Sequence, residues 1–287
     1  MIAQPIKNNI ITQYNSGITI SQLSKIYRYH FKTIRKLLTD NNIEIRTTNT
    51  WTRKYFYDTH FFRKINTEEK AYFLGFLYAD GCVTNNGLNL LIHPNDIEIL
   101  EKFKKSIKFT GNIEFRTEKR KNNGKYKNLI EKTAKIRIHS KEIIKDLVKL
   151  GCFQRKTFKL KFPTPQQVPH KFIVHFIRGF FDGDGSVYER KYTRKDGKKR
   201  GFAQITSTLN MIKNIKNILV KEFNIKRHSL NIKPHPTSNR IFILMIASFP
   251  GMKIFRNILY KDASIYLKRK KNKFDDLYLG SEFCHSK

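Results

Sequence analysis

The sequence predicts an α+β protein with two pseudo-symmetric half-domains, each of order helix, strand, strand, helix, strand, strand, helix (αββαββα), plus a small all-α module. Three observations predict this. The stretch FLGFLYADG at 73–81 is nearly repeated as IRGFFDGDG at 177–185. The same order of apolar periodicities follows each copy, which is typical of an internal repeat. Short apolar stripes in the first forty residues predict the separate helical module.

The N-terminal module is predicted to contain three short helices. An apolar stripe covers Ile6–Tyr14, Thr19 and Gln22 form a capping box before a second helix, and a third covers His30–Leu38. The stretch ITISQLSKIYRYHFKTIRKLL resembles the helix-turn-helix of site-specific recombinases and repressors, although any small three-helix bundle shares its apolar pattern. We assign residues 1–46 to this DNA-binding module and residues 47–65 to a linker. The outward side chains expected on DNA are those of Lys32, Thr33, Arg35 and Lys36.

Each copy of the repeated stretch predicts a helix with one face of small residues. Small residues four apart let two helix backbones approach closely. These residues are Gly75 and Ala79 in the first copy and Gly179 and Gly183 in the second. Asp80 and Asp184 follow in the last helical turn, where the helix dipole disfavours a carboxylate. We expect Gly81 and Gly185 to end the helices in the left-handed conformation, and a divalent metal to lie between the two acids.

The elements after each copy correspond one to one. After the first, the pattern predicts strands at 82–84 and 88–92, a helix at 96–107, strands at 112–117 and 133–139, and a helix at 141–150. After the second, it predicts strands at 186–192 and 202–206, a helix at 210–223, strands at 228–233 and 240–247, and a helix at 252–260. The half-domains are therefore assigned to residues 66–165 and 166–287.

Alternation along these strands predicts a polar sheet face that points away from the helices. Its basic and polar side chains suit the backbone of a nucleic-acid duplex, although a solvated face with nothing bound has the same pattern. The residues assigned to this face are Arg116, Lys135, Arg137, Tyr188, Arg190, Gln204, Lys233 and Arg240.

The composition favours a polyanionic partner. The formal net charge is +34 and the pI is about 10.1, with clusters of basic residues at 116–127, 190–200 and 268–273. The longest apolar run, 241–249, is far shorter than the roughly 20 residues of a spanning helix, and MIAQPIKN lacks a signal-peptide core. Three cysteines without paired or metal-ligand spacing indicate a reducing compartment, the cytoplasm or an organellar matrix.

Over residues 66–273 the chain resembles the LAGLIDADG homing endonuclease family in its single-chain, two-motif form. Tyr78 stands at a motif position where many members carry an acid, while Asp182 keeps that acid. The resemblance implies saddle-shaped antiparallel sheets and a catalytic role for Asp80 and Asp184. These two acids would hold Mg²⁺, or another divalent cation such as Mn²⁺.

The resemblance also implies a basic residue near the scissile phosphate at the end of each copy, for which Lys156 and Lys270 are the candidates. It implies polar pocket residues at the ends of the second strands, which here would be His93 and Ser207. His93 has an alternative assignment, as a helix-capping neighbour of Pro94.

The function expected from this resemblance is that of a site-specific endonuclease acting on double-stranded DNA. It would hydrolyse phosphodiester bonds at a long pseudo-palindromic target, leave short 3′ overhangs, act as a monomer, and serve intron homing of a mobile genetic element. Because the chain begins with Met1 and lacks the terminal residues of a splicing block, we expect no intein. Two alternatives stay open: an RNA maturase that binds intron RNA, and a DNA-binding transcription regulator with an inactive scaffold.

Overall fold

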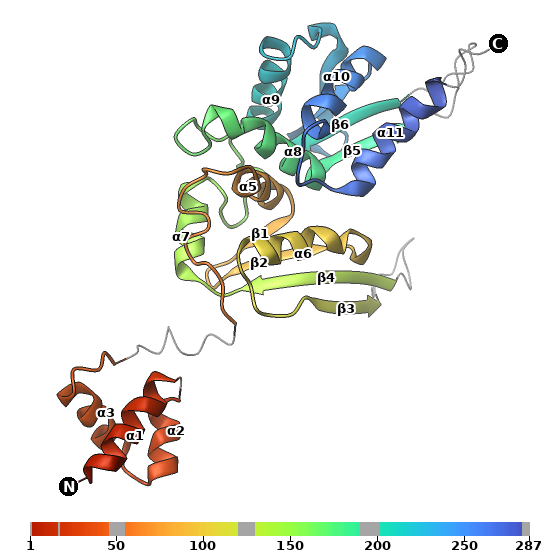
Figure 1. Cartoon of the computed structure of the whole chain (residues 1–287). Helices are drawn as coiled ribbons and strands as arrows, with labels where there is room; N and C mark the ends of the chain where they lie inside the picture. The colour runs from red at the N-terminus through yellow and green to blue at the C-terminus, as the bar shows by residue number, and fades with distance from the viewer. Residues whose placement is uncertain (1, 17, 46–54, 120–129, 190–200, 283–287) are drawn as a thin grey trace. The chain divides into compact units, whose positions relative to one another are not determined.

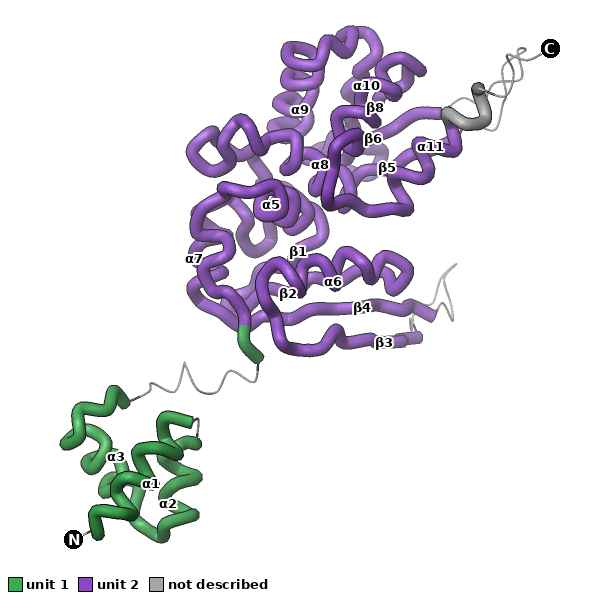
Figure 2. Tube along the Cα trace, viewed as in Figure 1, with its two compact units in different colours: residues 1–56 green, residues 57–287 purple. Residues whose placement is uncertain are grey.

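The computed structural model describes residues 2–16, 18–45, 55–119, 130–189 and 201–282, with side chains up to Leu277. The chain divides into two compact units, Met1–Phe56 and Tyr57–Lys287 (Figure 2). Each unit has its own core.

Unit 1 is a three-helix module. Its helices are α1 (Gln4–Asn15), α2 (Ile20–Tyr27) and α3 (Phe31–Asp40). The predicted capping box is present: Thr19 Oγ1 accepts from the Gln22 backbone N–H at 3.2 Å, and Gln22 Oε1 accepts from the Thr19 backbone N–H at 3.0 Å. Arg28, with φ of 55°, ends α2 in the left-handed conformation and begins the turn into α3. The small core is formed by Ile10, Tyr14, Leu23, Ile34, Leu37 and Leu38.

Unit 2 begins with part of the predicted linker. Tyr57, Phe61, Phe62 and Ile65 are all buried, and the Phe62 ring lies 6.5 Å from that of Phe103. Residues 57–65 therefore contribute to the core of unit 2, while 46–54 lie outside the described residues.

The two halves of unit 2 have the same topology (Figure 1). The first half contains α5 (Glu68–Asp80), β1 (Gly81–Val83), β2 (Leu88–Ile92), η1 (Pro94–Asp96), α6 (Ile97–Ser106), β3 (Glu114–Lys119), β4 (Ile130–Ile138) and α7 (Lys141–Lys149). The second contains η2 (His170–Phe172), α8 (Ile173–Asp184), β5 (Gly185–Glu189), β6 (Gly201–Ser207), α9 (Leu209–Lys221), η3 (Arg227–Ser229), β7 (Leu230–His235), β8 (Ser238–Ile246), α10 (Phe249–Tyr260) and α11 (Lys268–Glu282). The antiparallel sheets have orders β1-β2-β4-β3 and β5-β6-β8-β7, which confirms the predicted α+β class.

Helix α11 was not predicted. Its first residues, KRKKNK, read as a solvated basic run, and Phe274 and Leu277 follow at helical spacing. Both are buried, and the Phe274 ring lies 5.8 Å from Phe181. Because its first six residues are all polar, no apolar stripe runs along the whole helix, and its formation depends on the surface that Phe274 and Leu277 cover.

One face of each sheet forms the core beneath the helices. Leu90 pairs with Ile136 in the first sheet, Ile205 pairs with Leu244 in the second, and all four side chains are buried. The pleat directs the residues between them to the opposite, open face. None of the helices in the described ranges is long and apolar enough to cross a membrane.

Helices α5 and α8 pack against each other through glycine, as the small-residue pattern predicts. A Cβ on Gly75 would lie 2.0 Å from the Phe176 carbonyl oxygen, and one on Gly179 would lie 1.9 Å from that of Tyr72. Lower on the same face, a Cβ on Gly183 would lie 2.2 Å from Ala79 Cβ. The backbones are therefore in direct contact, which only glycine permits.

The predicted left-handed conformation at the helix ends is wrong. Gly81 has φ −71° and ψ 132°, and Gly185 has φ −82° and ψ 162°, so both are extended and lead directly into β1 and β5. Glycine is required here by close contact instead. A Cβ on Gly81 would lie 2.6 Å from the Leu77 carbonyl oxygen, and one on Gly185 would lie 2.3 Å from the Phe181 ring.

Candidate active site

The helix packing brings Asp80 and Asp184 to the same end of the α5–α8 pair. A Cβ built on Gly183, the residue before Asp184, would lie 3.3 Å from Asp80 Oδ2. Both aspartates remain accessible to solvent. The two motif acids that lie 104 positions apart in the sequence are therefore neighbours in the fold.

The carboxyl groups of this pair resist ionisation even though they reach solvent. Desolvation by the packed helix ends raises the pKa of Asp184 to about 7, and the negative charge of Asp80 adds to this, against the opposing effect of Lys156 and Lys270. Desolvation also raises the pKa of Asp80, and Lys270 and Lys156 oppose it. Two acids that are hard to ionise side by side form a place where added positive charge is stabilising.

Both predicted lysines are buried beside these acids. Lys156 Nζ donates to the carbonyls of Gly81 at 2.6 Å and Ala79 at 3.3 Å. Lys270 Nζ donates to the carbonyls of Phe181 at 2.8 Å and Gly183 at 2.9 Å. These carbonyls belong to the last turns of α5 and α8 and the residue that follows, where helix backbone acceptors lack partners. Each lysine thus places a positive charge at the end of one motif helix.

The charge of Lys270 is partly suppressed by its surroundings. The side chain is 4% exposed, and desolvation lowers its pKa to about 8 while the nearby acids Asp182 and Asp80 oppose this shift. Lys156 is also buried, at 9% exposed, so neither lysine is a solvent-facing side chain.

The motif position that differs between the copies lies behind the acid pair. Asp182 is buried and accepts hydrogen bonds from Tyr72 Oη at 2.8 Å, Tyr260 Oη at 2.7 Å and the Leu267 backbone N–H at 2.7 Å. At the matching position of the first copy, Tyr78 Oη donates to the Leu150 carbonyl at 2.5 Å. Both side chains tie the motif helix to the segment that leads to its lysine, so acid and tyrosine have the same structural task.

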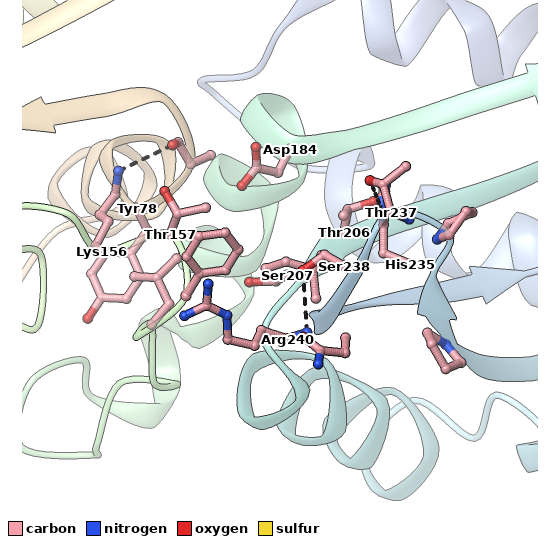
Figure 3. Close-up of a pocket in the computed structure, with 17 residues that line it drawn as sticks. Tyr78, Lys156, Thr157, Asp184, Thr206, Ser207, His235, Thr237, Ser238 and Arg240 are labelled. Atoms are coloured by element: carbon pink, nitrogen blue, oxygen red, sulfur yellow. Dashed lines mark hydrogen bonds between the residues drawn. The ribbon is translucent and has the colours of Figure 1, made fainter.

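An open pocket of about 1070 Å³ lies beside Asp184. Figure 3 shows Lys156 and Asp184 toward one end and His235 and Thr237 toward the other. Ser207 lines the pocket, and its buried Oγ has no hydrogen-bond partner among the described residues. The sequence did not single out Thr157, Phe158, Thr206, His235 or Thr237, which also line it. Thr157 is adjacent to Lys156 in sequence, whereas the β7–β8 turn reaches the pocket only through the fold.

His93 is not among the residues that line this pocket. Its side chain is exposed, and Nδ1 accepts from the Asn95 backbone N–H at 3.2 Å, so it caps the η1 turn. This geometry corresponds to the capping assignment that the sequence left open.

The open face of the first sheet is less basic than expected. Lys135 is 4% exposed and pairs with Glu114 at 3.2 Å, and Arg116 lies 3.7 Å from Glu118. Arg137 is exposed and donates from Nε to Asn89 Oδ1 at 3.1 Å. Acidic and basic side chains alternate on this face, so its chemistry is that of mixed hydrogen-bond donors and acceptors.

The second sheet presents a different open face. The Tyr188 ring stacks on Phe202 at 5.1 Å, and by strand register Gln204 and Lys233 lie on the same face. The remaining residue, Arg240, lies in the irregular part of the β7–β8 ladder. Its guanidinium lies 4.1 Å over the Phe158 ring, and it lines the pocket.

Two groups of the predicted DNA contacts remain. Arg190 lies outside the described residues. In unit 1, the four side chains nominated on α3 all lie at its exposed surface: Lys32, Thr33, Arg35 and Lys36.

The donor set fits a hard divalent cation. Asp80 and Asp184 supply carboxylate oxygens, and magnesium accepts few protein ligands because it retains several waters. Across the described ranges, no cluster of three or more His, Cys, Asp or Glu side chains forms a denser metal site.

No protein-family model matches the sequence. The sequence is similar to that of the probable translation initiation factor IF-2 of Methanocaldococcus jannaschii. The two are 24% identical over 189 residues, which are 65% of this chain and 14% of that protein. The chain therefore spans a small part of that relative.

Solved structures are similar in fold. The homing endonuclease I-WcaI bound to its DNA recognition sequence has a TM-score of 0.52 and 12% identity, covering 81% of this chain and 96% of that one. The I-LtrWI LAGLIDADG homing endonuclease bound to target DNA has a TM-score of 0.48 and 12% identity, covering 76% and 91%. The LAGLIDADG meganuclease I-AabMI bound to uncleaved DNA has a TM-score of 0.45 and 13% identity, covering 74% and 90%.

Proposed function

The chain has the LAGLIDADG homing endonuclease fold, and on that premise we propose that it is a site-specific endonuclease that cuts both strands of a DNA duplex. The observation that carries the proposal is the acid pair at the end of α5 and α8. Asp80 and Asp184 meet there, and Lys156 and Lys270 are buried against the same helix ends. A protein that only bound DNA would gain nothing from two neighbouring carboxyl groups whose pKa values are raised by desolvation.

Asp80 and Asp184 would hold divalent metal, Mg²⁺ or Mn²⁺, through their carboxylate oxygens. A bound divalent ion supplies Lewis-acid chemistry, which polarises a phosphoryl oxygen and lowers the pKa of water. The protein contributes the fixed placement of the two acids, because glycine contacts prevent α5 and α8 from sliding past each other. Placement of reacting groups accounts for a large part of catalysis in phosphoryl transfer.

The two lysines would stabilise the negative charge that develops on a scissile phosphate. Each Nζ is already held by two backbone carbonyls, so little reorganisation accompanies the reaction. Lys156 lies at the end of α5 and Lys270 at the end of α8, which gives one lysine for each of the two strands.

Ser207 and its neighbours would order water in the adjoining pocket. The buried Oγ lacks a protein partner among the described residues, so it is available to a water molecule or a phosphate oxygen. Thr157 and Thr206 add further hydroxyl groups to the same lining.

The open sheet faces would contact the duplex. Arg116 and Arg137 of the first sheet, and Gln204 and Lys233 of the second, supply donors for phosphates and base edges, whereas Lys135 is buried against Glu114. Because the two faces differ in sequence, the target is expected to be long and only roughly palindromic. Unit 1 would add contacts through the exposed side of α3.

The direct test is to incubate the purified protein with Mg²⁺ and DNA that spans the gene's uninterrupted insertion locus, followed by mapping of both cut ends. We expect cuts on the two strands that are offset by a few bases and leave 3′ overhangs, and no cutting in EDTA. A randomised DNA library provides the substrate where the locus is not identified. Cleavage that persists in EDTA, or intact DNA across the library at saturating protein, would contradict the proposal.

A further inference from the structure

The first turn of α11, in the second half, is anchored to acidic side chains of the first half. Arg269 forms a two-bond ion pair with Asp96, with Nε 3.0 Å from Oδ1 and Nη2 2.8 Å from Oδ2. The Lys268 backbone N–H donates to Glu98 Oε1 at 3.0 Å, and Lys268 Nζ lies 3.4 Å from Oε2. Asp96 is 8% exposed while the Arg269 side chain is 49% exposed, so the pair gains from its bidentate geometry and from the burial of its acid.

This anchor directly adjoins Lys270. Lys268 and Arg269 are the first two residues of α11, and Lys270 is the third. From there, Lys270 Nζ reaches the carbonyls of Phe181 and Gly183 at the end of α8. Fixing the first turn of α11 therefore fixes the backbone of Lys270, from which its side chain extends toward the acid pair.

The corresponding segment of the first half, which follows Lys156, is held by different interactions. After Lys156, the Leu160 carbonyl accepts from Thr208 Oγ1 at 2.7 Å, and the Phe162 backbone N–H donates to Asn210 Oδ1 at 2.8 Å. Thr208 and Asn210 lie at the start of α9, the counterpart of α6. Each half thus holds the segment that carries the lysine of the other half. The first half does so through ion pairs, and the second half through neutral hydrogen bonds.

We propose that Asp96 is a positioning residue for Lys270. Through the Asp96–Arg269 ion pair, the first half-domain would hold the lysine of the second half-domain in place. This inference rests on the proposed nuclease function, in which each lysine serves the phosphate near its own helix end. Loss of the Asp96–Arg269 pair loosens Lys270 and leaves Lys156 in place. One strand is then cut slowly and the other at the normal rate, which produces nicked duplex.

The test uses Asp96→Asn, which keeps the size of the side chain and removes its charge. On a strand-labelled target duplex the cleavage rate of one strand falls about ten- to hundredfold, as expected when a reacting group is misplaced by an ångström, and the other rate is unchanged. On a supercoiled plasmid the variant accumulates nicked circles. The reversed pair, Asp96→Arg with Arg269→Asp, brings the two strand rates back toward equality.

Asp275→Asn is the matched control. Asp275 Oδ1 lies 2.6 Å from Arg256 Nη2, an ion pair that ties the same helix α11 to α10 within the second half. Loss of this ion pair weakens the attachment of α11 to α10 but leaves the first turn of α11 bound to the first half. The cleavage rates of the two DNA strands should therefore stay equal. Equal slowing of both strands in Asp96→Asn would overturn the proposal, because that result indicates a general loss of structure.

A second measurement is independent of cleavage. Acetylation of the folded full chain with sulfo-NHS-acetate, mapped by mass spectrometry, should label Lys270 faster in Asp96→Asn than in the wild type, with unchanged labelling at Lys156. Unchanged labelling of Lys270 would refute the positioning role. A wild type that cuts no DNA would contradict the nuclease function, while the labelling comparison would still decide the role of Asp96.

Discussion

Gly179 packs its backbone directly against the carbonyl oxygen of Tyr72, so that a Cβ at this position would lie 1.9 Å from that oxygen. We predict that Gly179→Ala forces α5 and α8 apart and lowers the free energy of unfolding by about 1–3 kcal/mol, the usual effect of overpacking. Thermal unfolding followed by circular dichroism measures this change. Lys105→Ala, at an exposed helix position, is the control and should unfold close to the wild type. A melting temperature unchanged by Gly179→Ala would show that the helices are not in contact as described.

The sequence carried enough information for the acid pair and the repeated topology. Asp80 and Asp184 stand in matching local contexts, and small residues four apart predict close packing without knowledge of the rest of the fold. The lysines were found through the family resemblance, and the structure adds their burial against helix-end carbonyls.

Other features depend on long-range contacts that no local pattern contains. Arg269 and Asp96 are 173 residues apart, and nothing near either one indicates the other. Lys135 looked like an open-face cation, but strand register places Glu114 beside it. Gly81 has an ordinary extended conformation, because the chain passes straight from α5 into β1 and the limit on side-chain size comes from neighbouring atoms.

Asp80→Asn and Asp184→Asn are each expected to lower the cleavage rate at least about a hundredfold. Metal coordination to carboxylates contributes several kcal/mol to transition-state stabilisation, and each 1.36 kcal/mol corresponds to a factor of ten. Binding of target DNA should stay within a few-fold of the wild type, or become tighter, because a negative charge near the phosphates is removed. Cleavage assays with Mg²⁺, paired with gel-shift titrations in Ca²⁺, separate these effects. Cutting at the wild-type rate by either variant would remove that aspartate from the mechanism.

Arg137→Ala should change base preference at one position of the half-site that the first sheet contacts. Arg137 is exposed and its Nε–H is held by Asn89, which leaves the other guanidinium donors free to point toward a base edge. A bidentate contact of this type discriminates by about 1–3 kcal/mol. Selection from a randomised library should show relaxed preference at that base, while preferences in the other half-site are kept. A uniform loss of affinity over all positions would instead indicate a phosphate contact.

DNA binding by the whole chain should weaken steeply with salt. The formal net charge is +34, and release of counterions gives a slope of about −0.9 in log K against log salt for each neutralised phosphate. Five such contacts would give a slope of about −4.5. Fluorescence anisotropy with a labelled duplex from low to physiological salt measures it. A slope near zero is incompatible with a duplex held along the open sheet faces.

The triple variant Lys32→Ala, Arg35→Ala, Lys36→Ala tests whether unit 1 contacts DNA. These side chains lie at the surface of α3, so their removal leaves the core around Ile34 and Leu38 intact. If each contacts a phosphate, the salt slope falls by about 1 for each residue and the protected footprint shortens, while the cut positions stay the same. Lys25→Ala, a cation on the exposed side of α2, is the control and should keep the full footprint. A footprint of wild-type length in the triple variant would leave unit 1 as a helical bundle without a DNA contact on α3, and the target would then be read by unit 2 alone.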